Sequence, residues 1–299
     1  MSSRIGHHRR GNVVAYMALF FAFGLGTAAQ PAWAGTAGPT ESLGMSRGLE
    51  YLTADFAAVA SQAGPNVLCD GGDTVTGGGG RISGDPATAH LNATRPISTA
   101  GEGWVAEGTA DSGSRTVSAF AICGGRAVSW VPLGPAPVPS GNVYGSGTAC
   151  PAQEQNGVGG GVGGAGGNIR ILATFPFRPT YDWGSYVYNA GGTQASISEY
   201  AGCSTAYPVR YVSDSVEVGA GKPGSLRVRC GKRQAVTGGG FDLGEPGFES
   251  PETRLVSSRP VDLKLDANHV PDDAWLAKAY NGSAETQPLH VYAICFKAA

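Results

Sequence analysis

The sequence predicts an all-β protein built from three copies of one unit, and three observations lead to this fold class. One pattern, in which an opening cysteine is followed by a glycine run, a proline, a tryptophan and a closing cysteine, occurs three times with spacings of 81 and 80 residues. Glycine supplies 48 of the 299 residues and only 15% are charged, so the lysine and glutamate pattern of surface helices is nearly absent. Abundant valine, threonine and serine favour strands and turns. We therefore expect three tandem antiparallel Greek-key β-sandwiches, with a single pseudo-threefold β-prism of one sheet per copy as the alternative.

The first 34 residues, 1–34, have the features of a secretory signal peptide. Arg9 and Arg10 precede an apolar stretch at residues 13–25 and a small-residue cleavage signal at residues 32–34. Export to an oxidising compartment suits the six cysteines, so we expect a secreted protein that is extracellular or located in the cell envelope. No later segment approaches about 18 uninterrupted apolar residues, so we expect no membrane span in the mature chain. Retention of the leader as an anchor stays open.

The rest of the chain divides into a spacer and three repeats. Residues 35–47 indicate a flexible spacer because Gly, Thr, Pro and Ser cluster there. The repeats occupy residues 48–124, 125–204 and 205–299. In each we expect about six strands: one with an aromatic residue, one entering the opening cysteine, the glycine run, one ending at the proline, the tryptophan strand and the closing strand. Residues 51–63 are rich in alanine and leave a helix open.

The six cysteines predict one disulfide in each repeat. Several pairings are possible in principle, but three copies of one unit should fold alike. The pairing that treats them alike joins Cys69 with Cys123, Cys150 with Cys203, and Cys230 with Cys295. Closing loops of this length stabilises each unit by about 4 kcal/mol. A metal site is the competing interpretation, but it needs paired ligands at short spacing, and after the leader only His290 lies close to a cysteine. We expect no metal site and no cofactor.

The glycine runs have a structural and a functional interpretation. Gly159, Gly161 and Gly164 satisfy the G-x-G-x-x-G pattern of dinucleotide-binding proteins, but neither the preceding strand nor the following helix of that motif is evident. The run also recurs in the other two copies, which favours a structural role, since glycine in a strand marks the close approach of another group. We expect each repeat tryptophan to cover the glycine strip of its own unit, namely Trp104, Trp183 and Trp275.

The sequence offers little for catalysis or for nucleic-acid binding. It contains neither G-x-S-x-G nor H-E-x-x-H, and after the leader only His90, His269 and His290 remain, each in a single copy. We expect these histidines to be solvated surface residues. Without the three arginines of the leader, 18 basic residues face 23 acidic ones, a net charge of about −5, so nucleic acid is not an expected partner.

Aromatic residues concentrate in the second copy and are the candidate binding residues. We single out Phe177, Tyr181, Tyr186 and Tyr188, which stand in the same segment as Phe175 and Trp183. Tyr186 and Tyr188 would share one face of a strand, and exposed aromatic rings stack on sugars or anchor protein partners. Core packing of most of these rings is the alternative.

Acidic residues concentrate in the third copy. Its insertion between proline and tryptophan holds Asp262, Asp266, His269, Asp272 and Asp273, and a nearby loop holds Glu245, Glu249 and Glu252. Oxygen ligands in loops suit calcium, but the spacing is not that of an EF-hand, so the interpretation that we favour is a solvated acidic loop.

The order of Cys, Val-Thr-Gly-Gly-Gly, Ser/Thr-x-Pro, Trp and Tyr-Ala-Ile-Cys resembles a repeat of uncharacterised secreted actinobacterial proteins, as does the Leu-Phe-Phe-Ala core of the leader at residues 19–22. The resemblance covers nearly all of the mature chain and implies an extracellular or envelope location without an established reaction. We therefore predict a secreted, non-enzymatic β-repeat protein that binds a glycan or a protein at the cell exterior. A secreted hydrolase with an unrecognised active site is the alternative.

Overall fold

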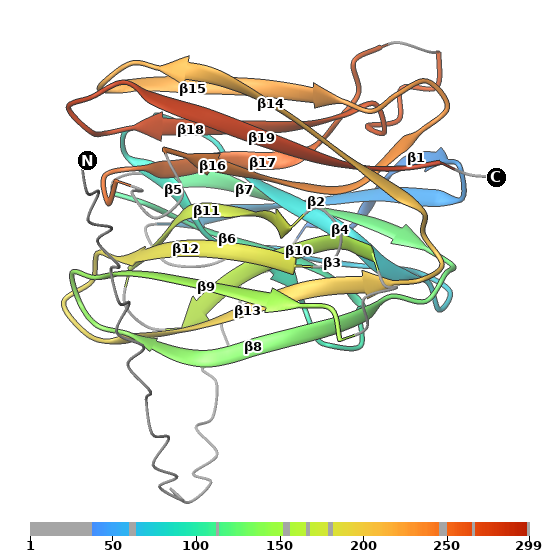
Figure 1. Ribbon diagram of the computed structural model, residues 1–299, viewed down its shortest axis with the longest axis horizontal. Coiled ribbons are helices and arrows are strands. Elements are labelled where there is room, and N and C mark those ends of the chain that lie inside the picture. Colours follow the sequence, from blue (N-terminus) through green and yellow to red (C-terminus); the bar gives the residue numbers. More distant parts are fainter. Residues whose placement is uncertain are drawn as a thin grey trace, which may run out of the picture. The chain divides into compact units, whose positions relative to one another are not determined.

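The computed structural model describes residues 38–59, 64–111, 114–151, 156–165, 168–178, 182–244, 250–264 and 267–297. The predicted signal peptide, residues 1–34, lies outside the described residues, and Gly35–Ala299 form one compact unit of their own. Every regular element that the structure describes is a strand, and all the pairings are antiparallel, so the predicted all-β class is confirmed (Figure 1). No helical segment of sufficient length and apolarity to span a bilayer occurs in the described part of the chain.

Six strands lie in each of the residue ranges expected for the three copies. In the first copy they are β2 (Leu49–Val59), β3 (Asn66–Leu68), β4 (Thr74–Ile82), β5 (Ala89–Pro96), β6 (Gly103–Ala110) and β7 (Ser114–Gly124). In the second they are β8 (Ser129–Val138), β9 (Val143–Ala149), β10 (Asn156–Ala165), β11 (Ile169–Arg178), β12 (Asp182–Asn189) and β13 (Ala195–Ser204). In the third they are β14 (Val209–Val218), β15 (Lys222–Arg229), β16 (Ala235–Leu243), β17 (Arg254–Val261), β18 (Ala274–Asn281) and β19 (Gln287–Phe296).

Two local expectations near the start of the first copy are settled by the structure. The predicted flexible spacer at residues 35–47 is wrong in its second half, because strand β1 (Glu41–Ser46) pairs there with β2. The segment at residues 51–63, for which a helix was open, begins within strand β2, which pairs with β7 along its whole length. Residues 60–63 lie outside the described residues.

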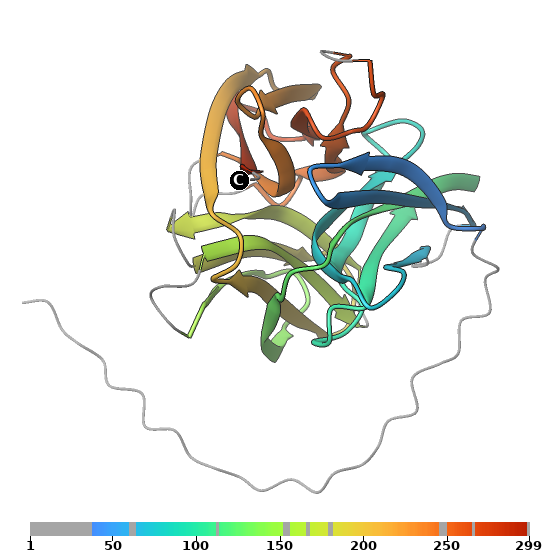
Figure 2. The same ribbon diagram turned by 90° about the vertical axis from the view of Figure 1, so that its right-hand side faces the viewer.

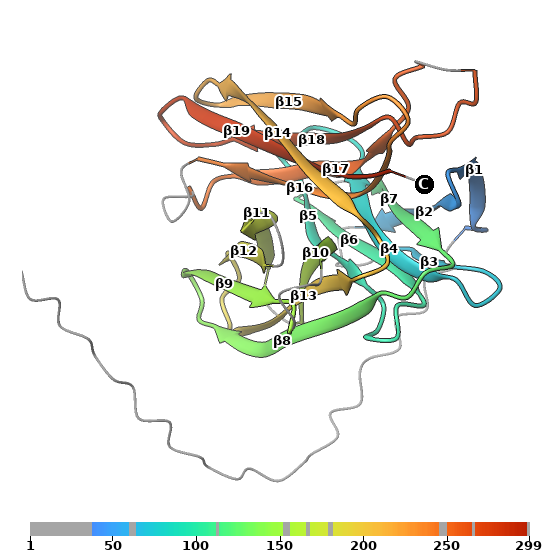
Figure 3. The ribbon, with the colours of Figure 1, turned by 45° about the vertical axis from the view of Figure 1, so that its right-hand side comes forward.

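The strands form three sheets, and each sheet is shared by two copies. Sheet A has the order β1-β2-β7-β4-β17-β18-β15, sheet B the order β3-β6-β5-β10-β13-β8, and sheet C the order β14-β19-β16-β11-β12-β9. Each copy divides its strands between two sheets, as in a sandwich, and the three copies surround a common centre, as in a prism (Figures 2 and 3). The alternative prism expected from the sequence has one sheet per copy, whereas in the structure each sheet contains strands of two copies. The copies meet at the strand pairs β4–β17, β5–β10 and β11–β16.

Glycine allows the central strands to approach this closely. A Cβ atom at Gly77, Gly159 or Gly238, the first glycine of each run, would lie under 3.0 Å from a backbone oxygen of another copy. The oxygens belong in turn to Thr237, Thr76 and Val158, so the contacts pass around the centre from copy to copy. Side chains at these three positions would separate the copies, which is the physical reason that the run recurs.

A second ring of contacts joins the copies through aromatic hydrogen bonds. The donor in each copy is the aromatic residue of its first long strand: Tyr51 Oη donates to the Val236 carbonyl at 2.7 Å, Trp130 Nε1 to Val75 at 3.1 Å, and Tyr211 Oη to Gly157 at 2.7 Å. Burial raises the pKa of both tyrosines, which keeps their hydroxyl groups protonated as donors. Each copy is thus tied to a different neighbour, and the ring is closed.

The predicted disulfides and the predicted role of the tryptophans are both confirmed. The bonds join Cys69 to Cys123, Cys150 to Cys203 and Cys230 to Cys295, with Cα atoms 5.7, 5.6 and 5.5 Å apart. A Cβ atom on the middle glycine of each run would clash with the tryptophan of the same copy: Gly78 with Trp104, Gly160 with Trp183, and Gly239 with Trp275. Each indole nitrogen also donates to a hydroxyl group before the repeat proline, on Thr94, Thr174 and Ser258. The tryptophans are therefore held in place by packing and by a hydrogen bond.

Candidate functional site

The outer faces of the three copy boundaries share one backbone arrangement and differ in their side chains. We call them the sheet A, sheet B and sheet C junctions, after the strand pairs β4–β17, β5–β10 and β11–β16. The third glycine of each run (Gly79, Gly161 and Gly240) lies against the Cα atom of the residue that precedes the repeat proline in the neighbouring copy. That residue is Arg259 in sheet A, Arg95 in sheet B and Phe175 in sheet C. Equivalent backbone positions therefore present a basic, an ion-paired and an aromatic surface.

The sheet C junction carries four neighbouring aromatic rings, of which three contact the fourth, Phe175. Phe175 from the second copy stacks on Tyr292 from the third, with ring centroids 5.6 Å apart and planes inclined by 21°. On its other side Phe175 lies 6.5 Å from Tyr186, nearly parallel at 12°, and 6.2 Å from Phe177. We call Tyr292, Phe175, Tyr186 and Phe177 the aromatic row. Its outermost ring, Phe177, is 53% exposed.

The glycine on the neighbouring edge strand sets the pose of Tyr186. Gly145 in β9 is the register partner of Tyr186 in β12, and a Cβ atom there would clash with the tyrosine ring. The ring therefore lies over the backbone of β9 instead of standing away from the sheet. Tyr188, two residues further along the same face, has the Arg170 guanidinium 5.9 Å from its ring centroid. Both tyrosines are half-buried.

Of the four predicted binding residues, the structure brings together Phe177, Tyr186 and Tyr188 on one face, while Tyr181 lies outside the described residues. The alternative of core packing holds for Trp183 and Phe175, which are 1% and 3% exposed. Sequence reasoning missed Tyr292, because its Tyr-Ala-Ile-Cys motif marks a closing strand in every copy. Its place beside Phe175 follows only from the pairing of β11 with β16. Burial, with a further contribution from Asp242, raises the pKa of Tyr292 to about 12.

At the sheet B junction the charge of Arg95 is balanced by a carboxylate of the same copy. Arg95 lies 3.8 Å from Glu107, and both side chains are about three-quarters buried. Burial raises the pKa of Glu107, and the charge of Arg95 acts in the opposite direction. A Cβ atom at Gly163 would clash with the Arg95 side chain, so glycine makes room for the arginine. This junction therefore offers neither free charge nor aromatic surface to a ligand.

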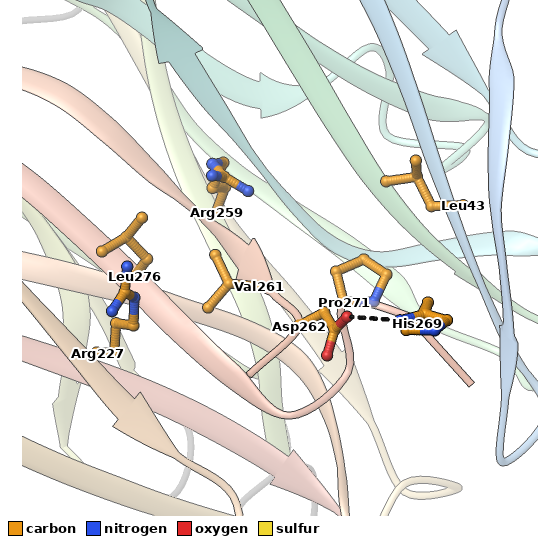
Figure 4. A pocket seen from close by; sticks show the side chains of 8 residues that line it. All are labelled: Leu43, Arg227, Arg259, Val261, Asp262, His269, Pro271 and Leu276. Atoms are coloured by element: carbon orange, nitrogen blue, oxygen red, sulfur yellow. Dashed lines mark ion pairs between the residues drawn. The ribbon is translucent and has the colours of Figure 1, made fainter. Parts of the chain in front are cut away.

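The sheet A junction adjoins a cavity with a volume of about 320 Å³. Its described lining residues come from β1 (Leu43), β15 (Arg227), β17 (Arg259 and Val261), β18 (Leu276) and the insertion of the third copy (Asp262, His269 and Pro271) (Figure 4). Arg259 also lies over the Phe120 ring of the first copy, 5.1 Å from its centroid. The cavity thus forms between strand β1 and the third copy.

The acidic residues of the insertion mostly hold the insertion itself in place. Asp262 lies 3.7 Å from His269, Asp273 accepts a hydrogen bond from the Leu263 amide at 2.9 Å, and Asp272 accepts one from the Ser46 hydroxyl of β1. Asp272 is only 5% exposed, so the expectation of a solvated loop is wrong for that residue.

The remaining acidic residues singled out for calcium are only partly described. Asp266, Glu245 and Glu249 lie outside the described residues, whereas Glu252 is exposed. Within the described residues, no three histidine, cysteine, aspartate or glutamate side chains gather as a metal site requires.

The three histidines have different environments. The His269 side chain is 73% exposed and His290 is half-buried, but the expectation of a surface position is wrong for His90, which is fully buried. Its Nε2 lies 3.1 Å from Asn168 Oδ1. Burial, and then the charge of Arg170, lowers the pKa of His90 to about 4, so its ring is neutral at neutral pH.

Comparison with known proteins adds no function to this geometry. No protein-family model matches the sequence, and no curated protein is significantly similar to it. The resemblance to secreted actinobacterial repeat proteins therefore stays a prediction.

Proposed function

We propose that this is a secreted, non-enzymatic β-repeat protein that binds a glycan at the cell exterior, through the aromatic row of the sheet C junction. The observation that carries this proposal is the cluster of Tyr292, Tyr186 and the exposed Phe177 around the buried ring of Phe175. Sugar rings bind to such surfaces because their C–H faces pack against aromatic rings while their hydroxyl groups remain solvated.

The surroundings of the row favour a glycan over a protein partner. The accessible part of the row is narrow, because Phe177 is more than half exposed, Tyr186 and Tyr292 are half-buried and Phe175 is only 3% exposed. Next to it, β9 presents Gly145 and Gly147, with Val143 as its one large exposed apolar side chain among the described residues of that strand. A stable protein interface needs about 800 Å² on each partner with a desolvated centre. A strip of stacked rings suits an extended saccharide chain better.

An oxidising location and a binding role agree with the other features. Each copy holds a disulfide bond, which is typical of exported proteins, and the predicted leader supplies a route of export. Both features support a protein that acts outside the cytoplasm.

The test is retention on immobilised polysaccharides and binding to a glycan array, with Phe177→Ala in the row and Tyr188→Ala, two residues beyond Tyr186 on the same face of β12, as variants. Tyr280→Ala is the matched control, because Tyr280 occupies in β18 the position of Tyr188 in β12, five residues after the repeat tryptophan, and is equally half-buried. We expect both sheet C variants to lose retention and the control to keep it. Equal retention by all three variants, or release of reducing sugar from the polysaccharide, would contradict the proposal.

A further inference from the structure

We propose that the cavity at the sheet A junction is a second ligand site, which binds a compact oxyanion, a carboxylate or a sulfate, carried on a small saccharide-sized body. This inference is independent of the aromatic row, because the two sites lie on different sheets and share no residue. It goes beyond the proposed function by assigning a charged ligand class to a site formed by the third copy and strand β1.

The charge balance of the cavity is the first argument. Two guanidinium groups, those of Arg227 and Arg259, line it, and Arg81 of the first copy stands near enough to Arg259 to act on its charge. Among the described residues no carboxylate lies within ion-pair distance of these three arginines, and the one acidic residue among the described lining residues, Asp262, lies 3.7 Å from His269. Two arginines against one carboxylate, with a third arginine nearby, give the cavity an excess of positive charge that favours an anion.

The surroundings of Arg259 agree with this balance. Burial, followed by the like charges of Arg81 and Arg227, lowers the pKa of Arg259 to about 10. The guanidinium is still charged at neutral pH, so the molecule tolerates this repulsion in the folded state. A bound oxyanion would relieve it, because arginine pairs with carboxylate and sulfate oxygens through parallel hydrogen bonds.

The pose of Arg259 is fixed before any ligand binds. Its guanidinium lies over the Phe120 ring, and its Nη1 donates to the Pro260 carbonyl at 3.2 Å. A long side chain that is already ordered loses little entropy on binding, which favours affinity. Arg227, by contrast, is exposed on β15 and completes the basic wall from the neighbouring side (Figure 4).

The remaining wall is apolar and limits the size of the ligand. Leu43, Val261, Pro271 and Leu276 line the cavity opposite and beside the arginines. The volume of about 320 Å³ lies at the lower end of the range of small-molecule sites. A single charged sugar unit, with one anionic group and one apolar face, matches both the cations and the apolar wall.

The insertion of the third copy forms part of the cavity wall, and contacts with strand β1 hold it in place. Val270 in the insertion is 4% exposed and packs against Gly44 of β1, where a Cβ atom would clash with it. Asp272 binds the Ser46 hydroxyl on the same strand. The two ends of the cavity wall are thus held together, and the other two copies have no insertion at this point.

The experiment is a calorimetric titration of the whole protein with sodium D-glucuronate, sodium sulfate and, as the neutral probe, D-glucose. We expect glucuronate, sulfate or both to bind and glucose not to bind. Arg259→Gln and Arg227→Gln should each weaken anion binding by about tenfold, the loss of a charged hydrogen bond. Arg229→Gln is the control, because Arg229 is exposed on the same strand two residues from Arg227 but does not line the cavity.

The outcomes separate this site from the aromatic row. Phe177→Ala should leave anion binding unchanged, so a failure of glycan binding at sheet C would not affect the result. Arg227→Gln keeps the test valid if Arg259→Gln fails to fold, because Arg227 is exposed. Binding of glucose as strong as that of glucuronate, or equal anion binding by Arg227→Gln and Arg229→Gln, would overturn the proposal, as would the absence of binding by both anions.

Discussion

At the sheet C junction Phe175 lies against Tyr292, whereas at the sheet A junction Arg259 lies against Phe120. In both, a residue before the repeat proline of one copy covers the ring on the closing strand of another. The centroid distance between the two rings is 5.6 Å, and that between guanidinium and ring is 5.1 Å, so the packing is closely alike. The chemistry is opposite, because one pair extends an apolar row and the other adds to a basic cluster.

This difference teaches that the scaffold and the ligand surface are separable. The inner contacts depend on the glycines, the tryptophans and the ring of aromatic hydrogen bonds, which take equivalent forms in all three copies. The outer face of each junction uses side chains that the inner contacts do not require. A threefold scaffold can therefore carry three different surfaces at equivalent places.

The most drastic way to break the comparison is to remove the neighbouring copies. We expect residues 125–204, expressed alone with their disulfide, to lack a cooperative unfolding transition, because β10 and β11 would lose their partners β5 and β16. Circular dichroism and thermal denaturation against the full chain measure this. A stable isolated repeat would show that the copies fold independently and that the junctions are mere contacts between finished domains.

The second way is to fill the space beneath the repeat tryptophan, which takes the same form in all three copies. Gly239→Val should destabilise the protein by about 5 kcal/mol or more, because the side chain would meet both the Trp275 ring and the Tyr292 carbonyl oxygen. Since the sheets are shared, we expect the whole molecule to melt at the lower temperature instead of the third copy alone. Gly192→Ala, whose Cβ atom would have open space, is the control. A melting curve of Gly239→Val that matches this control would contradict the packing.

The sequence predicted the structural features that depend on residues of a single copy. The disulfides and the cover of each tryptophan over its glycine follow from a pattern that each copy repeats, and the alternation of Arg227 and Arg229 with Leu226 and Val228 places the arginines outside, as the structure shows. What the sequence could not show is which copies meet. Arg259 belongs to the Ser-Ser-Arg-Pro segment of the repeat, and nothing in that segment indicates that Phe120 lies beneath it.

The third prediction concerns an acid that only the second copy has. Glu199 is 1% exposed and accepts hydrogen bonds from the Ser146 hydroxyl and the Thr148 amide of β9, the strand beside the aromatic row. The first and third copies carry Ala119 and Val291 at this position. Burial raises the pKa of Glu199 to about 7, against opposing effects of its two hydrogen bonds. Strand β9, at the edge of sheet C, is therefore held by the titratable carboxyl group of Glu199.

The sign of the resulting pH dependence follows from the raised pKa. Between about pH 4.5, where the unfolded chain releases this proton, and about pH 7, where the folded chain does, stability falls as pH rises, by at most about 3 kcal/mol, and then levels. Glu199→Gln should remove this fall and be more stable than the parent protein at pH 8. Denaturant titrations at pH 5 and pH 8 measure it, with exposed Glu217→Gln as the control. The same fall in Glu199→Gln as in the parent would assign the effect to another group.

The smallest expected change in stability comes from a substitution that gives the sheet A junction the aromatic pair of the sheet C junction. It is also the sharpest test of the comparison. In Arg259→Phe the new ring should stack on Phe120 as Phe175 stacks on Tyr292, and Arg81 and Arg227 lose a like-charged neighbour. We expect the free energy of unfolding to change by less than about 1 kcal/mol, while binding of glucuronate or sulfate weakens by about tenfold, as in Arg259→Gln. Arg259→Ala, which leaves Phe120 uncovered, should cost about 1–2 kcal/mol and weaken anion binding equally. If Arg259→Phe were as unstable as Arg259→Ala, the two junctions would not be interchangeable in packing. If it kept its affinity for the anion, the charge at this position would not define the site.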